Sequence, residues 1–328
     1  MPNLGTCAGG VAILTTFGIM GCKGADGVTA MRASGTWMAD LNPTEWSVPV
    51  NLGPSINTAS SEVQLGIAPN GKSLYVMSNR AGGSGDADIW VSSRQPGGSW
   101  GPLVNLGATV NSSALDASPT LSVDGHYLYF ASRRPGGLGG LDCWRSYRAD
   151  PSDDFAWETP ENLGPSVNSA FDDADCLPVG NQNANGEFWF TSLNRPDGKG
   201  GYDIYKSDID SDGSFGAAVP VAELNTTGRD TRLTLTGNGL TIYFTSNRAG
   251  GLGGIDIWTA SRKTKNSPFC APVNLGTSIN SSADDRSPSI TTNGKELYFT
   301  STRPGGFGSD DAYVAERAGG PSHLDCDL

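Results

Sequence analysis

The sequence predicts an all-β fold, a five-bladed β-propeller of four-stranded antiparallel blades closed by the N-terminal strand (three plus one). Three observations lead to this prediction: an aromatic block that recurs five times, a hairpin dipeptide before every copy, and an incomplete repeat at each end. A four-stranded unit repeated around a channel is the propeller solution to unpaired sheet edges.

The recurring block is an apolar, aromatic strand that ends in arginine. The first copy reads Ser-Leu-Tyr-Val-Met-Ser-Asn-Arg, and the copies occupy 73–80, 127–134, 187–195, 241–248 and 296–303. The closing arginines are spaced by 54, 61, 53 and 55 residues: Arg80, Arg134, Arg195, Arg248 and Arg303. Five copies at this period leave little room for a second domain.

Each repeat divides into the same four strands. A short apolar strand is joined to the aromatic block by Asn-Gly or Asp-Gly, which tolerate the positive φ angles of a tight hairpin. A glycine-rich loop then leads to a third strand such as 256–258. A fourth strand begins at an aromatic residue and runs into Asn-Leu-Gly or a shortened form of it.

The ends of the repeat region indicate how the ring closes. A fourth-strand sequence at 46–52 precedes the first repeat, and the last repeat stops after its third strand near Arg317. We therefore expect the propeller to cover 46–317, with a linker at 22–45 and a C-terminal tail at 318–328.

The pattern Leu-Tyr-Phe-x-Ser-x-Arg-x-Gly-Gly-x-Gly-Gly-x-Asp-Ile-Trp resembles the WD40-like repeat of bacterial TolB-type propellers, and the resemblance covers about 46–317. It implies a non-enzymatic, TolB-like scaffold of the cell envelope whose partner is an envelope protein or a cell-wall glycan. Since one fold hosts many functions, two alternatives stay open: a carbohydrate-active propeller (glycoside hydrolase or lectin) using acids at the channel mouth, and an intracellular structural module.

The N-terminus has the features of an export signal. An apolar run at 11–21 is too short to span a bilayer and has the length of a signal-peptide core. The segment Ile19-Met20-Gly21-Cys22 resembles a bacterial lipobox, which implies removal of 1–21 and lipidation of Cys22. A lipoprotein signal, an ordinary secretory signal and a meaningless apolar stretch remain the three interpretations. The first predicts a periplasm-facing or surface lipoprotein of the bacterial cell envelope.

The net charge of −12 bears on partners. Nucleic acids and anionic lipid surfaces both attract basic proteins, so neither is expected to bind this chain. We expect a monomer that contacts a membrane only through the lipid anchor.

An acidic residue precedes the first strand of every repeat, where propellers line their channel. These residues are Glu62, Asp116, Asp173, Asp230 and Asp285, with Asp175 a competing match in the third repeat. One interpretation is a ring that binds a cation or a sugar at the channel mouth. The other is structural pairing of each acid with the arginine of its own repeat.

Further motifs give little chemistry. The glycine-rich loops open no helix and lack the Lys-Ser/Thr of a phosphate-binding loop. Asp208, Asp210 and Asp212 match the first half of a calcium loop, but Val219 stands where that loop needs glutamate. We expect no cofactor, with calcium as the single possibility.

No catalytic residue is assigned, and a non-enzymatic protein is the favoured interpretation. The two histidines, His126 and His323, offer no base for a Ser-His-Asp triad. A glycosidase needs two carboxyl groups that flank the scissile bond, and such a site would break the fivefold symmetry of the acid ring.

The cysteines show no Cys-x-x-Cys spacing, so a zinc site is not predicted. Cys143, Cys176, Cys270 and Cys326 follow the signal region. Cys270 begins a fourth strand next to the point where the tail leaves the last blade. We therefore predict a disulfide between Cys270 and Cys326, with a frayed tail and free thiol as the alternative.

Overall fold

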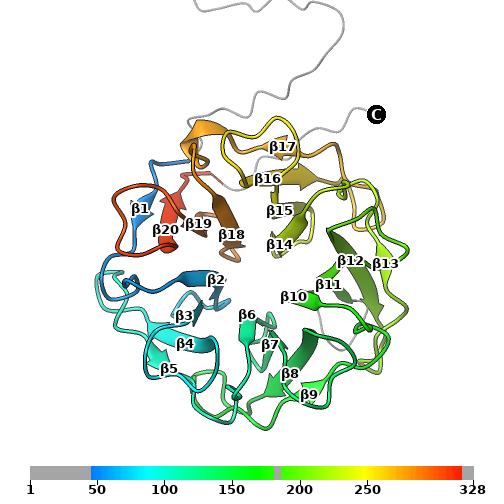
Figure 1. Ribbon diagram of the computed structural model, residues 1–328, viewed down its shortest axis with the longest axis horizontal. Helices are drawn as coiled ribbons and strands as arrows, with labels where there is room; N and C mark the ends of the chain where they lie inside the picture. Colours follow the sequence, from blue (N-terminus) through cyan, green and yellow to red (C-terminus); the bar gives the residue numbers. More distant parts are fainter. Residues whose placement is uncertain (1–45, 181–185, 320–328) are drawn as a thin grey trace, which may run out of the picture. The chain divides into compact units, whose positions relative to one another are not determined.

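The computed structural model describes residues 46–180 and 186–319, which form five four-stranded antiparallel sheets arranged around one axis (Figure 1). The predicted five-bladed, all-β propeller is thereby confirmed. The sole helical element in these residues is one 3₁₀ turn, η1 (Gly276–Ser278). No helix in this part of the chain is long and apolar enough to cross a membrane.

Each blade runs from an inner strand at the axis to an outer strand at the rim. Blade 1 consists of β2 (Glu62–Ile67), β3 (Ser73–Ser78), β4 (Asp88–Ser93) and β5 (Val104–Asn105). Blade 2 consists of β6 (Asp116–Leu121), β7 (Tyr127–Ser132), β8 (Asp142–Tyr147) and β9 (Glu161–Asn162). Blade 3 consists of β10 (Asp173–Val179), β11 (Gly186–Leu193), β12 (Tyr202–Ile209) and β13 (Val219–Pro220). Blade 4 consists of β14 (Asp230–Leu235), β15 (Thr241–Ser246), β16 (Asp256–Ser261) and β17 (Val273–Asn274).

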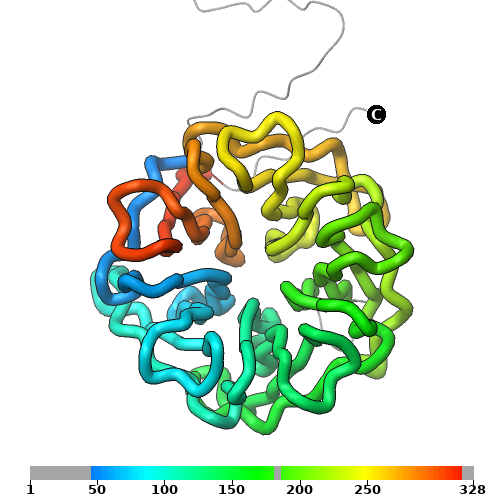
Figure 2. Tube along the Cα trace, viewed as in Figure 1, coloured from blue at the N-terminus to red at the C-terminus, as the bar shows by residue number. Residues whose placement is uncertain are grey.

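Blade 5 closes the ring with a strand from the other end of the chain. It contains β18 (Asp285–Ile290), β19 (Glu296–Ser301), β20 (Asp311–Glu316) and, at the rim, β1 (Val50–Asn51). Val50 pairs with Val314 and Asn51 with Tyr313, as the incomplete repeats predicted. In Figure 2 the blue start of the described chain lies beside its red end.

The aromatic second strands form the core between neighbouring blades. Tyr75, Tyr129, Phe188 and Phe244 are almost completely buried, and each packs in a cluster with apolar side chains of an adjacent blade. Because every blade buries its faces against two neighbours, the core is a ring of inter-blade clusters.

A side-chain bridge between blades explains the recurring Ile/Val-Asn dipeptide. The Asn111 amide accepts a hydrogen bond of 2.9 Å from the Ile89 backbone N–H and donates one of 2.9 Å to the Ile89 carbonyl. The same reciprocal pair joins each of the other loop asparagines to a third strand: Asn57, Asn168, Asn225 and Asn280. These amides satisfy the buried third-strand N–H groups and share the third-strand carbonyls with a backbone N–H, such as that of Leu106 to Ile89.

One disulfide also links two blades, and the sequence analysis missed it. Cys143 on β8 is bonded to Cys176 on the inner strand of the next blade. Cys270 is disulfide-bonded too, whereas Cys326 lies outside the described residues. The predicted Cys270–Cys326 pairing therefore stays a prediction, as do the proposed signal segment and the lipid on Cys22, which also fall outside the described residues.

Candidate functional site

The five acids that precede the inner strands are buried and bound to protein groups. Glu62, Asp116, Asp173, Asp230 and Asp285 each have 0% exposure. Each carboxylate accepts a hydrogen bond from the backbone N–H four residues earlier, for example 2.6 Å from Ser112 to Asp116. These acids therefore cap the loop that enters their blade.

The repeat arginines complete this arrangement. Arg134 lies 2.6 Å from Asp116, and the other pairs have N–O distances of 2.6–3.0 Å: Arg80–Glu62, Arg195–Asp173, Arg248–Asp230 and Arg303–Asp285. Each guanidinium also lies over the aromatic ring of its third strand, as Arg134 does over Trp144 at 5.3 Å. Of the two interpretations of the acid ring, this geometry favours structural pairing. The expectation that these acids form a ring at the channel mouth was wrong, because they are buried and their oxygens accept hydrogen bonds from other protein groups.

A different ring faces the channel. The third residue of every inner strand is a β-bulge with φ between +52° and +56°, which interrupts the register with the second strand. We call these residues the channel ring: Gln64, Ser118, Asp175, Arg232 and Ser287. Left-handed backbone is costly for such residues, so its recurrence in all five blades marks a built feature. The buried acids are aspartate in four blades and glutamate in one, whereas the ring carries four chemically different residue types.

Asp175 is the acceptor at the centre of this ring. Its Oδ1 accepts from Ser118 Oγ at 2.9 Å and from Gln64 Nε2 at 3.4 Å. Its Oδ2 accepts from Thr191 Oγ1 at 2.7 Å, Thr231 Oγ1 at 2.8 Å and the Arg232 backbone N–H at 2.7 Å. The sequence analysis weighed Asp175 as an alternative to Asp173, and the structure places the two on different sides of the inner strand.

A cavity of about 220 Å³ opens above the channel ring, at the end where the inner strands begin. Its polar walls come from Asp175 and Arg232 of the ring, with Arg133, Tyr202 and Arg229 on the rim. Arg133 follows the second strand of its blade, where the other blades carry asparagine or threonine. Tyr202 precedes the third-strand aspartate, where the other blades carry alanine, leucine, isoleucine or aspartate. The cavity therefore lies where the fivefold repeat is broken.

The positive charge of this cavity is only partly compensated. Arg133 lies 3.4 Å from Asp172, and Arg229 lies over the Tyr202 ring at 5.5 Å. Within the described residues, no carboxylate lies within 4.0 Å of a guanidinium nitrogen of Arg229 or Arg232. Burial lowers the pKa of Arg232, and the nearby Asp175 charge partly offsets this.

Tyr202 is half-buried at the edge of this cavity. Burial first, then the charges of Asp172 and Asp175, raise the pKa of the Tyr202 hydroxyl. The phenol therefore stays protonated at neutral pH and can donate a hydrogen bond into the cavity.

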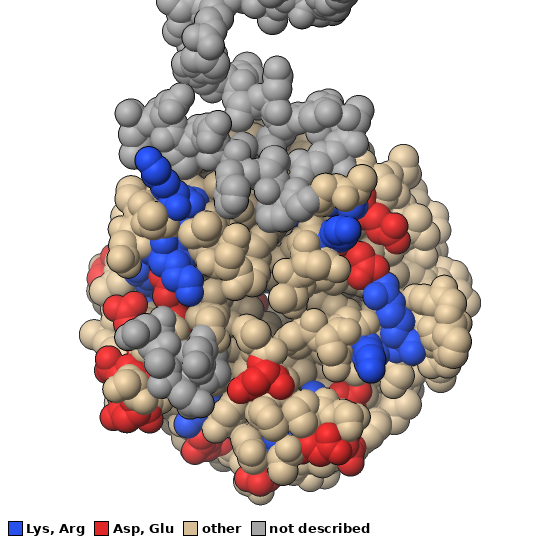
Figure 3. Space-filling view, turned by 180° about the vertical axis from the view of Figure 1, so that it is seen from behind, with Lys and Arg blue, Asp and Glu red and all other residues tan. Residues whose placement is uncertain are grey.

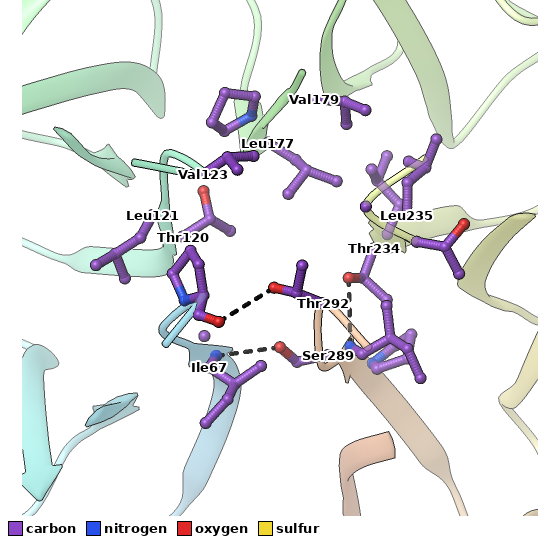
Figure 4. A pocket seen from close by; sticks show the side chains of 18 of the residues that line it. Ile67, Thr120, Leu121, Val123, Leu177, Val179, Thr234, Leu235, Ser289 and Thr292 are labelled. Atoms are coloured by element: carbon purple, nitrogen blue, oxygen red, sulfur yellow. Dashed lines mark hydrogen bonds between the residues drawn. The ribbon is translucent and has the colours of Figure 1, made fainter. Parts of the chain in front are cut away.

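In the described residues, the opposite mouth of the channel is lined by apolar side chains and by threonine and serine hydroxyls, without a charged group. A smaller cavity of about 90 Å³ lies there, lined by the ends of the inner strands, including Ile67, Leu121, Leu177 and Leu235 (Figure 4). Hydrogen bonds such as the one of 3.2 Å that the Ile67 N–H donates to Ser289 Oγ connect neighbouring inner strands at this end. Seen from behind in Figure 3, charged side chains of both signs lie mostly towards the periphery. Among the described residues, the charged side chains that line the two cavities are thus confined to the first one.

The remaining predicted site residues do not assemble into a centre. Asp208, Asp210 and Asp212 are exposed around a hairpin tip, where Asp212 caps Ser214. Among the described residues, no group of three or more His, Cys, Asp or Glu side chains is arranged to hold a metal. His126 Nδ1 contacts the Arg148 carbonyl at 2.9 Å, away from the channel, and His323 lies outside the described residues.

The comparisons with known proteins concern the fold. No family model matches the chain, and no curated protein matches it. Among solved structures, a thermostable family-43 glycoside hydrolase matches with a TM-score of 0.56 and 13% identity, covering 80% of this chain and 91% of that one. An endo-arabinase from Bacteroides thetaiotaomicron has a TM-score of 0.56 at 13% identity, with 85% and 99% covered. The GH62 α-L-arabinofuranosidase domain from Coprinopsis cinerea has a TM-score of 0.55 at 11% identity, with 84% and 97% covered.

These likenesses show the fold. A putative TolB from Agrobacterium tumefaciens also matches, at 18% identity and with 78% of each chain covered, with a lower TM-score of 0.46. The expectation of a non-enzymatic, TolB-like envelope scaffold was wrong. It rested on the repeat motif, whereas the solved propellers that match with TM-scores above 0.5 are glycoside hydrolases.

Proposed function

We propose that this chain is a carbohydrate-active propeller that binds a glycan in the cavity above the channel ring. The observation that carries the proposal is the break in fivefold symmetry at that cavity. The cavity is lined by Asp175, Arg232, Tyr202 and Arg133, and each differs from the residues at the same repeat position of the other blades. The buried acid–arginine pairs, in contrast, recur in every blade. The names of the matching propellers, an endo-arabinase and arabinofuranosidases, support a glycan as the ligand class.

The cavity has the chemistry of a sugar site. Guanidinium and phenol groups donate hydrogen bonds to ring hydroxyls, and an aromatic face packs against the apolar face of a sugar. Met77, Leu115 and Ala117 supply apolar wall between these polar groups. Convergent polar groups with apolar side chains between them are typical of small-ligand sites.

Binding is better supported than cleavage. A glycosidase needs an acid and a second carboxylate on either side of the bond. Asp175 is the single carboxylate among the described residues that line the cavity, and five donors already occupy its oxygens. Glycoside hydrolysis is therefore the second candidate, favoured by the fold it shares with the matching enzymes.

A glycan array followed by calorimetry tests the proposal. Tyr202→Ala should weaken binding of any glycan that the array retains by about tenfold or more, equivalent to at least 1.4 kcal/mol. Phe307→Ala is the matched control, because Phe307 is 50% exposed in a glycine-rich loop and lines neither cavity. Retention of no glycan, or equal weakening by both substitutions, would overturn the proposal. Release of new reducing ends by the wild type would instead establish the hydrolase.

We also propose that the protein is exported and anchored through Cys22. The Cys143–Cys176 disulfide supports export, since disulfides persist in oxidising compartments. Mass spectrometry of native protein should show loss of 1–21 and lipid on Cys22. An intact Met1, or unchanged membrane fractionation of Cys22→Ser, would contradict it.

A further inference from the structure

We propose that the glycan is acidic and that its carboxylate binds the guanidinium groups of Arg229 and Arg232. This inference rests on the proposed glycan site and names the class of sugar it would take. The reasons are the number of arginines in one small cavity, the lack of anions beside two of them, and the contrast with the neighbouring blade.

Three of the lining side chains are arginines, and one is a carboxylate. Arg133, Arg229 and Arg232 face the same 220 Å³ volume as Asp175. The protein as a whole carries a net charge of −12, so a positively charged cavity runs against its average surface. A local excess of cations in a concave site raises the concentration of anionic ligands there.

Asp175 does not neutralise these arginines by direct contact. Its two oxygens face Ser118, Gln64, Thr191, Thr231 and a backbone N–H. Among the described residues, the Arg232 side chain donates a single hydrogen bond, from Nη1 to Ser287 Oγ at 3.1 Å. Its other N–H groups stay available to a carboxylate, which matches the planar guanidinium in a bidentate geometry.

In blade 5, an arginine beside the channel ring is paired with carboxylates of the protein. Arg286, next to its channel-ring residue Ser287, lies 2.9 Å from Asp310 and 3.5 Å from Asp284. Asp310 and Asp284 stand at the repeat positions that Tyr202 and Arg229 occupy in blades 3 and 4. At the corresponding positions beside the cavity, a phenol and a further guanidinium therefore stand in place of the two carboxylates of blade 5.

Calorimetry with four probes tests the inference: trigalacturonate, its methyl ester, xylotriose and inorganic sulfate. Esterification removes the negative charge and keeps the sugar rings. We expect the acid to bind about tenfold or more tightly than the ester, with a preference that shrinks as salt screens the charges. Arg229→Gln and Arg232→Gln should each reduce the preference for the acid several-fold. Lys263→Gln, which removes an exposed charge elsewhere, should leave it unchanged.

The outcomes separate the two proposals. If xylotriose and the ester bind as tightly as the acid and Tyr202→Ala weakens all three, the glycan site stands and the acidic specificity is wrong. If sulfate alone competes as strongly as trigalacturonate, the cavity is a simple anion site and the inference is also wrong. If no oligosaccharide binds at all, the proposed function itself fails.

Discussion

Asp175 Oδ1 accepts a 2.9 Å hydrogen bond from Ser118 Oγ, and the two residues hold the same bulge position in adjacent blades. One residue of the channel ring, Asp175, therefore accepts hydrogen bonds from residues of the other blades. Gln64 and Thr231 reach the same carboxylate from blades 1 and 4, so four of the five blades meet at this side chain.

Replacing Asp175 should destabilise the whole propeller. In Asp175→Asn, the amide nitrogen cannot accept the hydrogen bonds that one carboxylate oxygen now takes. A buried donor left unsatisfied costs about 1–3 kcal/mol of unfolding free energy. Urea denaturation measures the loss. Asp212→Asn, on an exposed hairpin tip, is the control and should change stability by less than about 0.5 kcal/mol. Equal stability of the two variants would contradict the role of Asp175.

Breaking a single buried acid–arginine pair should cost more than breaking a surface pair. Asp116→Asn leaves the Arg134 guanidinium, whose side chain is 12% exposed, without its counter-charge. The expected loss is about 3–5 kcal/mol. Glu161→Gln removes the 62% exposed partner of Arg145 and should cost less than about 1 kcal/mol.

The same variant also addresses the cation interpretation of the acid ring. Calcium should not change the melting temperature of the wild type or of Asp116→Asn. A calcium-dependent rise that is present in the wild type and absent in the variant would show a cation site, by linkage between binding and stability.

The inter-blade disulfide should contribute substantially to stability. Cys143 and Cys176 are 33 residues apart, and closing a loop of that length stabilises a fold by about 4 kcal/mol in the chain-entropy model. Denaturation of the double variant Cys143→Ala/Cys176→Ala measures the effect. Thiol labelling of unreduced, unfolded protein gives the control for pairing, and labelling of Cys270 would also rule out its predicted bond to Cys326.

The sequence predicted the architecture because each strand boundary carries a local signal. The Asn-Gly and Asp-Gly dipeptides, the repeat arginines and the displaced strand at 46–52 each act over a few residues, and together they count the blades. The acid–arginine pairs were within reach for the same reason, since both members recur at a fixed offset of 18 residues in four of the five blades.

The channel ring could not be predicted in this way. Its position depends on a bulge in the inner strand, and neither Gln64 nor Arg232 has a residue type that favours φ above zero. Strand alternation without a bulge places Asp116 and Ser118 on the same face, so the sequence could not separate the buried acids from the residues that face the channel.

The Cys143–Cys176 bond was missed although a signal existed. At the position of Cys143, blade 3 carries Ile204 and blade 5 carries Ala312. At the position of Cys176, the blades that follow them carry Leu233 and Leu65. Ile204 packs in one cluster with Leu233, and Ala312 packs in one cluster with Leu65. Aligning third strands with the inner strands of the next blade would have paired the cysteines. Sequence spacing alone does not show that relationship between blades.

Blade 3 also lacks a hydrogen-bond donor that the other blades possess. In blades 1, 4 and 5, an outer-strand asparagine donates to the third-strand aspartate, as Asn105 Nδ2 does to Asp88 at 2.9 Å. Pro220 takes that place in blade 3, opposite Tyr205. Asp203 Oδ2 accepts from Lys199 and Gly200 N–H groups, but its buried Oδ1 has no hydrogen-bond partner in the described part of the chain. Burial raises the pKa of Asp203 above its ordinary value of 3.8.

Pro220→Asn should supply the missing donor and stabilise the protein at neutral pH. Because the folded pKa of Asp203 is raised, its contribution to stability is fully present below pH 3.8 and is lost as the pH rises through the folded pKa. A donor to the carboxylate lowers that pKa and should restore about 1 kcal/mol at pH 7, an advantage that disappears in acid. Urea denaturation at pH 7 and near pH 4 measures both. Val219→Asn introduces the same side chain at a 47% exposed position and should show no such gain. A gain for Pro220→Asn that is equal at both pH values would mean that removal of proline, rather than the charge of Asp203, causes it.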